Sequence, residues 1–243
     1  MYKMHCENLK QIEEGIKIIQ VDLRRYISTE NKKNEEIYTR LFSYLTTCWT
    51  EVRISKLAHE PSVFSTEEIE DVLSASTLKD KWITALNYSV CKANNINLTN
   101  NKLEIQKKLS FTPKIRYLEL INLIEDDLLN SIEIRNKIAH GQWTYAFTSD
   151  LKSFSKKSTG MIRKENIVTL QLKVKLFKSL AQVIHDLAVS PSTFERNFDI
   201  HYKVIEQQRN NLHKRSYKSY RSKMINKYRR GIVKRRSMKT TSL

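Results

Sequence analysis

The chain places an arginine, an amide and a histidine close together near its middle, at Arg135, Asn136 and His140. Histidine is the side chain best suited to proton transfer near neutral pH. A guanidinium that lies among apolar residues needs an acidic or phosphate partner, unless it reaches solvent. The set therefore suits proton transfer beside an anion, and its geometry depends on the element that carries it.

These side chains do not all point the same way on an ideal helix, where successive residues are rotated by ~100°. Asn136 and His140 are four residues apart and share a face. Arg135 and His140 differ by ~140° in direction and by ~7.5 Å along the axis. A working site therefore needs the reach of the arginine, a distorted helix end, or a second copy of the chain.

Each of the two charged candidates also has a structural alternative. Arg135 could form an ion pair with Glu51 or Glu125, and His140 could simply end a helix before Gly141. A helix end favours the charged imidazole, whereas a nearby arginine opposes it. Arg135 interrupts an apolar stripe on the expected helix, which consists of Ile121, Ile124, Leu128, Ile132 and Ala139.

Apolar residues recur at three- and four-residue steps along most of the chain, which predicts an all-α protein. Only four glycines and three prolines occur, as expected for long helices. Near Asn130 we prefer a continuous or kinked helix to a fresh start with Asn130 as N-cap. The predicted elements are helices at 5–27, 33–59, 78–93, 114–140, 171–188 and 192–230, a short helix opening at Ser65, a polar connector at 94–102 and a frayed tail at 231–243.

Residues 144–172 depart from the helical pattern. Residues 144–148 could form a short strand and 167–172 its partner, with a Ser- and Lys-rich loop between them. We therefore predict a small β-hairpin insertion in this region.

The motif resembles the Arg-x-x-x-x-His signature of the HEPN superfamily of helical ribonucleases. Arg135, the polar Asn136 directly after it, and His140 match that pattern residue by residue. Residues 48–53, followed by Trp82, resemble an uncharacterised bacterial branch of the family. The family-like residues that flank the motif are Ile134, Ala139 and Gly141.

The resemblance implies a HEPN-like helical bundle over residues 1–190. The basic helical extension predicted at 191–243 and the insertion near 144–170 are not part of the family's minimal domain, so the particular subfamily stays open. The resemblance also implies a metal-independent endoribonuclease without a cofactor. The ribose 2′-hydroxyl would attack the adjacent phosphate, leaving a 2′,3′-cyclic phosphate and a 5′-hydroxyl. His140 would act as general acid or base, Arg135 would neutralise the phosphate charge, and Asn136 would orient the histidine or the phosphate.

The resemblance carries expectations about partners as well. Family members are typically homodimers whose two motifs face one another. Their toxin and phage-defence settings imply a cellular RNA, such as tRNA, as the substrate. They also imply an antitoxin or another defence-system protein as a partner.

The net charge of +17 is concentrated near the C-terminus. Residues 201–243 hold 14 Lys or Arg against one acid, Glu206, a net +13, whereas residues 1–200 carry +4. This predicts a polyanion partner, nucleic acid before membrane. Aromatic and apolar residues recur at three- and four-residue intervals in the basic region, at Tyr217, Tyr220, Met224 and Tyr228. They either pack the region onto the body or stack on bases. The cations predicted to contact RNA are Lys218, Arg221, Lys223, Lys227, Arg229 and Arg230.

Other sequence features bound the function. No apolar run approaches the ~20 residues of a membrane span, and the first residues lack the apolar core of a secretory signal. The cysteines, Cys6, Cys48 and Cys91, predict reduced thiols in a cytoplasmic protein. Neither a zinc-ligand spacing nor a Gly-rich phosphate loop occurs, so we predict no metal and no cofactor.

Three further polar groups are interpreted as structural. The acids at 125–127 and the pair Glu51 and Arg53 are expected on solvated surfaces, and His185 with Asp186 is assigned no role. Two other functions stay open: a HEPN module that binds RNA or a protein without cleaving, and an RNA-binding protein of another helical family.

Overall fold

The computed structural model describes the backbone of residues 1–240 and the side chains of all of these except residues 236 and 238–240. Within that range the chain is helical and forms no strand, which confirms the all-α prediction. The elements are α1 (Tyr2–Ser28), α2 (Lys32–Ala58), α3 (Thr66–Ser74), α4 (Leu78–Ala93), α5 (Lys102–Lys108), α6 (Phe111–Asn122), the π-helical turn η1 (Leu123–Leu128), α7 (Leu129–Ala139), α8 (Lys156–Lys164), α9 (Ile167–Val189), α10 (Pro191–Lys214) and α11 (Tyr217–Thr240).

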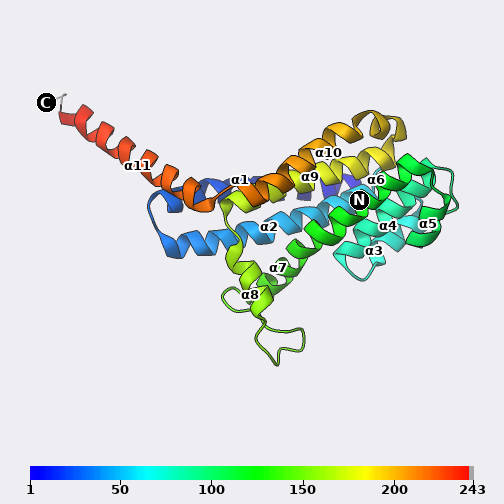
Figure 1. The fold of residues 1–243 in the computed structure, drawn as a ribbon, viewed down its shortest axis with the longest axis horizontal. Helices are drawn as coiled ribbons and strands as arrows, with labels where there is room; N and C mark the ends of the chain where they lie inside the picture. The colour runs from blue at the N-terminus through cyan, green and yellow to red at the C-terminus, as the bar shows by residue number, and fades with distance from the viewer. Residues whose placement is uncertain (241–243) are drawn as a thin grey trace.

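Two long helical hairpins, α1 with α2 and α9 with α10, form the length of the body (Figure 1). Helix α2 is central, because it packs against α1, α3, α4, α7 and α9. Helices α3 to α6 gather at one end of the body, whereas α8 and the loop before it protrude beside α7 (Figure 1). The element that carries the arginine–histidine motif therefore lies between the central helix and a peripheral loop.

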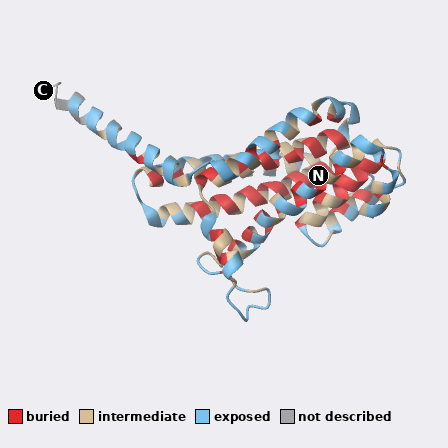
Figure 2. Cartoon of the chain, viewed as in Figure 1, coloured by how far each residue is buried: buried red, intermediate tan, exposed pale blue. Residues whose placement is uncertain are grey.

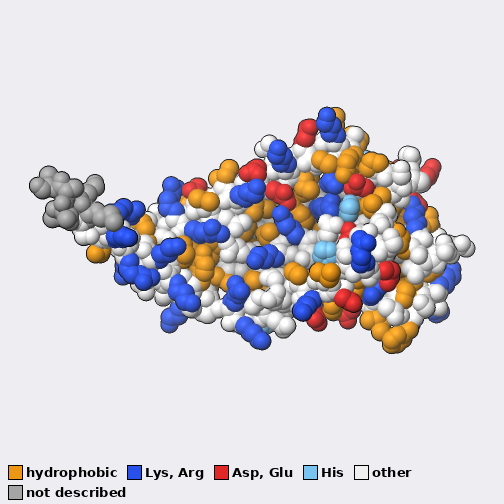
Figure 3. All heavy atoms as spheres, turned by 90° about the horizontal axis from the view of Figure 1, so that it is seen from above, with side chains coloured by type: hydrophobic (Ala, Val, Ile, Leu, Met, Phe, Trp, Pro, Cys, Tyr) orange, Lys and Arg blue, Asp and Glu red, His pale blue; other side chains and the backbone are white. Residues whose placement is uncertain are grey.

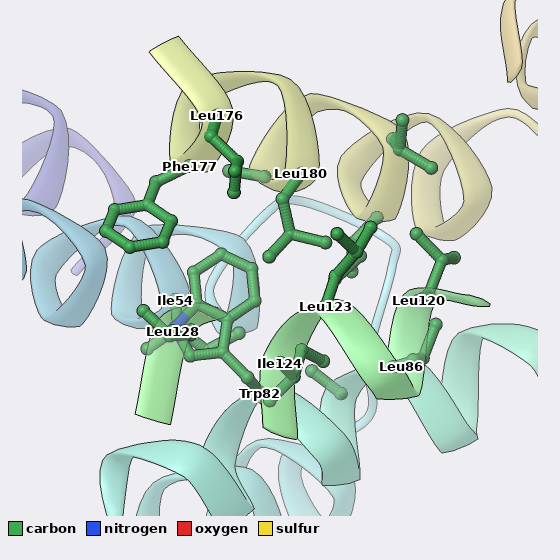
Figure 4. Close-up of a cluster of buried hydrophobic side chains, with 14 of the residues drawn as sticks. Ile54, Trp82, Leu86, Leu120, Leu123, Ile124, Leu128, Leu176, Phe177 and Leu180 are labelled. Carbon is green, nitrogen blue, oxygen red and sulfur yellow. The ribbon is translucent and has the colours of Figure 1, made fainter. Parts of the chain in front are cut away.

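The core explains why these helices assemble. Buried residues follow the inward faces of the long helices, and exposed residues cover the outside (Figure 2). Trp82 of α4 meets Leu128 of η1 and both Phe177 and Leu180 of α9 in one cluster (Figure 4). The same core continues past residue 190, since α10 contributes Phe194, Phe198 and Ile205.

Side-chain caps explain where several helices begin. Each capping side chain accepts a backbone N–H of the first turn, a group that has no partner within the helix. Ser65, where a short helix was predicted to open, forms a capping box with Glu68. The other capping residues are Asn31, Thr77, Asn101, Ser155 and Asn166.

The segment from α6 through η1 to α7 is one continuous helix, as preferred from the sequence, but it contains a π-helical turn. Asn130 is not an N-cap, because its side chain donates to the carbonyl of Asp126 one turn earlier. The predicted apolar stripe is buried from Ile121 to Ile132, whereas Ala139 is exposed. A π turn inserts one residue and so rotates the faces that follow it.

The predicted hairpin partner at 167–172 is wrong. These residues open α9, because Asn166 accepts the N–H groups of Val168 and Thr169 and forms a capping box. The β-branched residues Ile167 and Val168 at the start of α9 are then buried in the core. The loop before α8 is closed by a single antiparallel bridge between Phe147 and Phe154.

The predicted single helix over 192–230 is two helices. The chain breaks at Arg215 and Ser216, and the Ser216 hydroxyl accepts the N–H of Ser219 at the start of α11. The first half of α11 packs against α1 and α9, and its second half projects from the body (Figure 1). Residues 231–240, expected to be frayed, continue this helix, and 241–243 lie outside the described residues.

Replacing Trp82 by alanine tests the core. The side chain is only 2% exposed, so the substitution leaves a cavity and lowers the free energy of unfolding by about 3–5 kcal/mol. Urea denaturation measures the change. Phe111→Ala is the matched control, because Phe111 is 78% exposed, and it should change stability by less than about 0.5 kcal/mol. Equal losses in both variants would contradict this core.

Candidate functional site

Arg135 lies on the side of α7 that faces the central helix. Its Nη2 atom forms an ion pair with Oε2 of Glu51 at 3.2 Å, and its side chain is 19% exposed. Its Nε atom is buried without a hydrogen-bond partner. Of the two acids considered from the sequence, Glu51 is the partner, whereas Glu125 pairs with Lys102.

Asn136 and His140 lie together on the exposed side of the same helix. Both line a groove of about 770 Å³ between the end of α7 and the loop before α8. Arg135 does not line this groove. The structure therefore brings the amide and the imidazole together, as their spacing predicted, and directs the guanidinium elsewhere.

Gly141 determines how α7 ends beside the groove. Its φ of +74° is the left-handed conformation that favours glycine. Its N–H donates to the carbonyl of Ile138 at 3.0 Å, and the N–H of Gln142 donates to that of Lys137 at 2.9 Å. These two bonds form a Schellman motif, so Gly141 is the C′ residue predicted from the sequence, and His140 lies at the C-cap.

The loop after α7 is tied to the body by Arg40 of α2. Nε of Arg40 donates to the Trp143 carbonyl at 3.2 Å, and Nη1 donates to the Ile162 carbonyl at 2.7 Å. A small second core lies beneath the loop and joins it to α7 and α8: Ile134, Ile138, Ala146 and Ile162. The groove walls are therefore held in place by both polar and apolar contacts.

The loop presents large apolar side chains to solvent beside His140. Tyr145 and Phe154 pack edge to face, and the guanidinium of Arg163 lies over the Tyr145 ring. Phe147 and Leu151 are exposed and line the groove. Singly exposed apolar residues are ordinary, but a cluster of them marks an interaction surface.

Lysines complete this surface. Lys137 and Lys157 both line the groove, and Nζ of Lys137 donates to the Phe147 carbonyl at 2.6 Å. Sequence reasoning assigned neither lysine nor the loop aromatics to the site. The available signal was the recurrence of aromatic residues at 145, 147 and 154 in a stretch with no helical period. The arrangement offers proton transfer, base stacking and phosphate contact in one place.

The residues of α11 that were considered for RNA contact divide into two sets. Tyr217, Tyr220 and Met224 pack against the core, whereas Tyr228 is exposed. Arg221 and Arg229 form ion pairs with Glu35 at 3.6 Å and Glu30 at 2.6 Å. The other four cations predicted to contact RNA form no ion pair with a described residue and are exposed: Lys218, Lys223, Lys227 and Arg230.

A second polar cluster is buried between α1, α2, α9 and α10. Arg53 is 8% exposed, so the expected solvated pair with Glu51 is wrong. His185 Nε2 lies 3.4 Å from Glu60, and Asp186 lies 3.7 Å from both His185 and His201. The helices that meet here exclude water from Arg53, which the sequence pattern had placed on a solvated surface.

The acidic cluster at 125–127 is not wholly solvated either. Asp127 is half-buried and lies 3.1 Å from Nε of Arg209, because α10 covers this turn of η1. Burial raises the pKa of the Asp127 carboxyl. Across the described residues, no group of three or more His, Cys, Asp or Glu has the geometry to hold a metal ion.

Comparison of the chain with protein-family models, curated proteins and solved structures finds no match. None of the helices within residues 1–240 combines the length and apolar character that a membrane span requires. The geometry of the groove and of the charged surfaces therefore carries the functional argument.

The buried imidazole of His185 should make stability depend on pH. Burial, together with repulsion from Arg53, lowers the pKa of His185 from its ordinary value near 6.5. The unfolded chain then binds a proton that the folded protein resists, so the free energy of unfolding should fall as pH falls through 6.5. Urea denaturation between pH 8 and about pH 5.5 measures this slope.

His185→Gln should flatten that slope, because it removes the buried imidazole. His5, whose pKa is also lowered by burial, supplies part of the remaining dependence. Parallel curves for wild type and His185→Gln would contradict the assignment.

Proposed function

We propose that the protein is a metal-independent endoribonuclease of the HEPN type. The observation that carries the proposal is that Asn136 and His140 share a solvent-facing groove with the aromatic ring of Phe147 and with Lys137 and Lys157. Aromatic rings stack on bases, and lysines contact phosphates. An imidazole in that setting is placed to move a proton on a bound RNA strand.

The proposed reaction is a transesterification within the RNA. The ribose 2′-oxygen forms a bond to the adjacent phosphorus as the bond to the 5′-oxygen breaks. His140 either removes the proton of the 2′-hydroxyl or supplies one to the leaving 5′-oxygen, and Asn136 orients the imidazole or the phosphate. The products are a 2′,3′-cyclic phosphate and a 5′-hydroxyl, and Arg135 neutralises the charge that develops on the phosphate.

Arg135 supports the proposal only if a second copy of the chain takes part. In one copy it pairs with Glu51 and lies off the groove that holds His140. In a two-fold dimer, Arg135 of one copy can approach the phosphate held at His140 of the other. The half-exposed Glu51 then holds the guanidinium in position until substrate replaces it.

The basic surface of α11 is proposed to hold the rest of the RNA. Lys and Arg side chains spread over the part of the surface toward this helix, with few acids between them (Figure 3). The family setting makes a cellular RNA such as tRNA the proposed substrate, and an antitoxin or another defence-system protein a proposed partner, in the cytoplasm.

One observation favours a second candidate. The Arg135–Glu51 ion pair satisfies the arginine within a single copy, as expected of a HEPN module that binds RNA or protein without cleaving it. The two candidates differ in product: only the nuclease leaves a 2′,3′-cyclic phosphate.

Substituting the motif tests the chemistry. His140→Ala should slow RNA cleavage by about 10²–10⁴-fold, because it removes the group that transfers the proton. End-group analysis of the products should show a cyclic phosphate for the wild type. His213→Ala is the matched control, since this exposed histidine lies at the end of α10. Cleavage that survives His140→Ala at the wild-type rate would refute the assignment.

Mixing two inactive variants tests the shared site. Arg135→Ala and His140→Ala are each expected to be inactive alone. Random exchange of subunits makes half of the dimers mixed, and each mixed dimer has one complete site, so activity should return to about a quarter of wild type. No recovery from a mixture that sedimentation shows to be dimeric would contradict a site shared between copies.

Removing charge from α11 tests the RNA surface. A variant with alanine at four exposed positions should bind single-stranded RNA with a salt slope lower by about 3, since each phosphate contact contributes ~0.7. Electrophoretic titration at several salt concentrations measures the slope. The substituted residues are Lys218, Lys223, Lys227 and Arg230.

The control for this variant removes the same charge from other elements, at exposed lysines that form no described ion pair. It should retain the wild-type slope, and equal slopes for both variants would show that total charge, not α11, determines binding. The control residues are Lys3, Lys10, Lys107 and Lys203.

A further inference from the structure

A second cavity lies apart from the α7 groove, where the start of α11 meets α1 and α9. Its volume is about 630 Å³, within the range typical of small-molecule sites. It shares no lining residue with the groove that holds His140. Lys223 is the one cation predicted to contact RNA that also lines this cavity.

The lining of this cavity is cationic. Four basic residues line it: Arg24 of α1, Lys175 of α9, Arg215 in the turn before α11, and Lys223 of α11. No acidic residue lines it. All four are exposed, and none forms an ion pair with a described residue. By contrast, Arg221 and Arg229 on the same surface are neutralised by glutamates.

Unpaired cations around one hollow repel each other, and a bound anion relieves that repulsion. Arginine binds phosphate through two parallel hydrogen bonds, and lysine binds it as a point charge. Hydroxyls of Ser216 and Ser219 lie on the same wall and can donate to phosphate oxygens. The basic side chains and hydroxyls of the cavity therefore suit a phosphate group.

Apolar and aromatic side chains also line the cavity. Val168 and Leu172 of α9 contribute buried side chains, and Val174 and the half-buried Tyr220 lie beside them. Apolar and aromatic surface can cover a nucleobase, whereas a free phosphate has no use for it. Gln20 and Gln171, which bond to each other at 3.1 Å, offer an amide donor and acceptor to the edge of a base.

We propose that this cavity binds a nucleoside phosphate, with the phosphate on Arg24, Lys175, Arg215 and Lys223 and the base against the apolar wall. The ligand is either a free nucleotide or the terminal nucleotide of an RNA carrying a 5′-phosphate. The inference does not rest on the proposed nuclease activity, because it concerns other residues and binding is measured without cleavage.

Calorimetric titration of the full chain tests the site. The probes are ATP, tripolyphosphate, and a short RNA with either a 5′-phosphate or a 5′-hydroxyl, all added to the His140→Ala protein so that RNA is not cleaved. Lys175→Glu with Arg215→Glu reverses two charges in the cavity. Lys107→Glu with Lys203→Glu reverses two exposed charges on α5 and α10, outside both the cavity and the proposed RNA surface.

We expect saturable binding at one site. The cavity variant should weaken it by about tenfold or more, because charged hydrogen bonds are lost. The control variant should weaken it by less than about twofold. ATP binding of this kind, tighter than that of tripolyphosphate, supports a free nucleotide. A preference of the same size for 5′-phosphorylated over 5′-hydroxyl RNA supports a chain end.

Two results would overturn the proposal. If both charge-reversed variants weaken every probe equally, binding reflects net charge and not the cavity. If tripolyphosphate binds as tightly as ATP and the RNA end makes no difference, the apolar wall does not recognise a nucleoside. Loss of cleavage in wild type leaves this test unaffected, so the two proposals fail separately.

Discussion

The packing of α7 against α2 decides which side chains of the motif can reach solvent. Within this interface the buried Thr47 hydroxyl donates to the Ser131 carbonyl at 3.2 Å, and Glu51 pairs with Arg135. One face of α7 is therefore committed to the body. Asn136 and His140 stay on the free face, and whatever binds them must come from the groove side.

The sequence predicts most of the helices because each buries one face, which leaves a three- and four-residue apolar period. Residues 78–93 are found with the predicted bounds, and α2 differs by one residue at each end. The sequence-based prediction fails where a helix cap or a tertiary contact outweighs the local preference of the residues. Asn166 opens α9 through residues that favour strands, and α11 leaves the line of α10 without a proline or glycine.

The site is predictable only as far as it is local. That Asn136 and His140 share a face follows from their spacing, and that α7 ends at Gly141 follows from the residue type. The groove has no such signature, since Arg40 holds the loop and α8 through the carbonyls of Trp143 and Ile162, both more than 100 residues away. The buried cluster around Arg53 likewise depends on four helices meeting, which no single segment reveals.

The contact between α1 and α11 has a consequence for how the chain folds. Glu30 and Arg229 are 199 residues apart, yet they form an ion pair. The helical hairpins can form from neighbouring segments within microseconds, but this contact closes a loop that spans most of the chain. During synthesis, the outer face of α1 therefore stays uncovered until α11 is made. We expect the docking of α11 onto α1 to be among the last steps of folding.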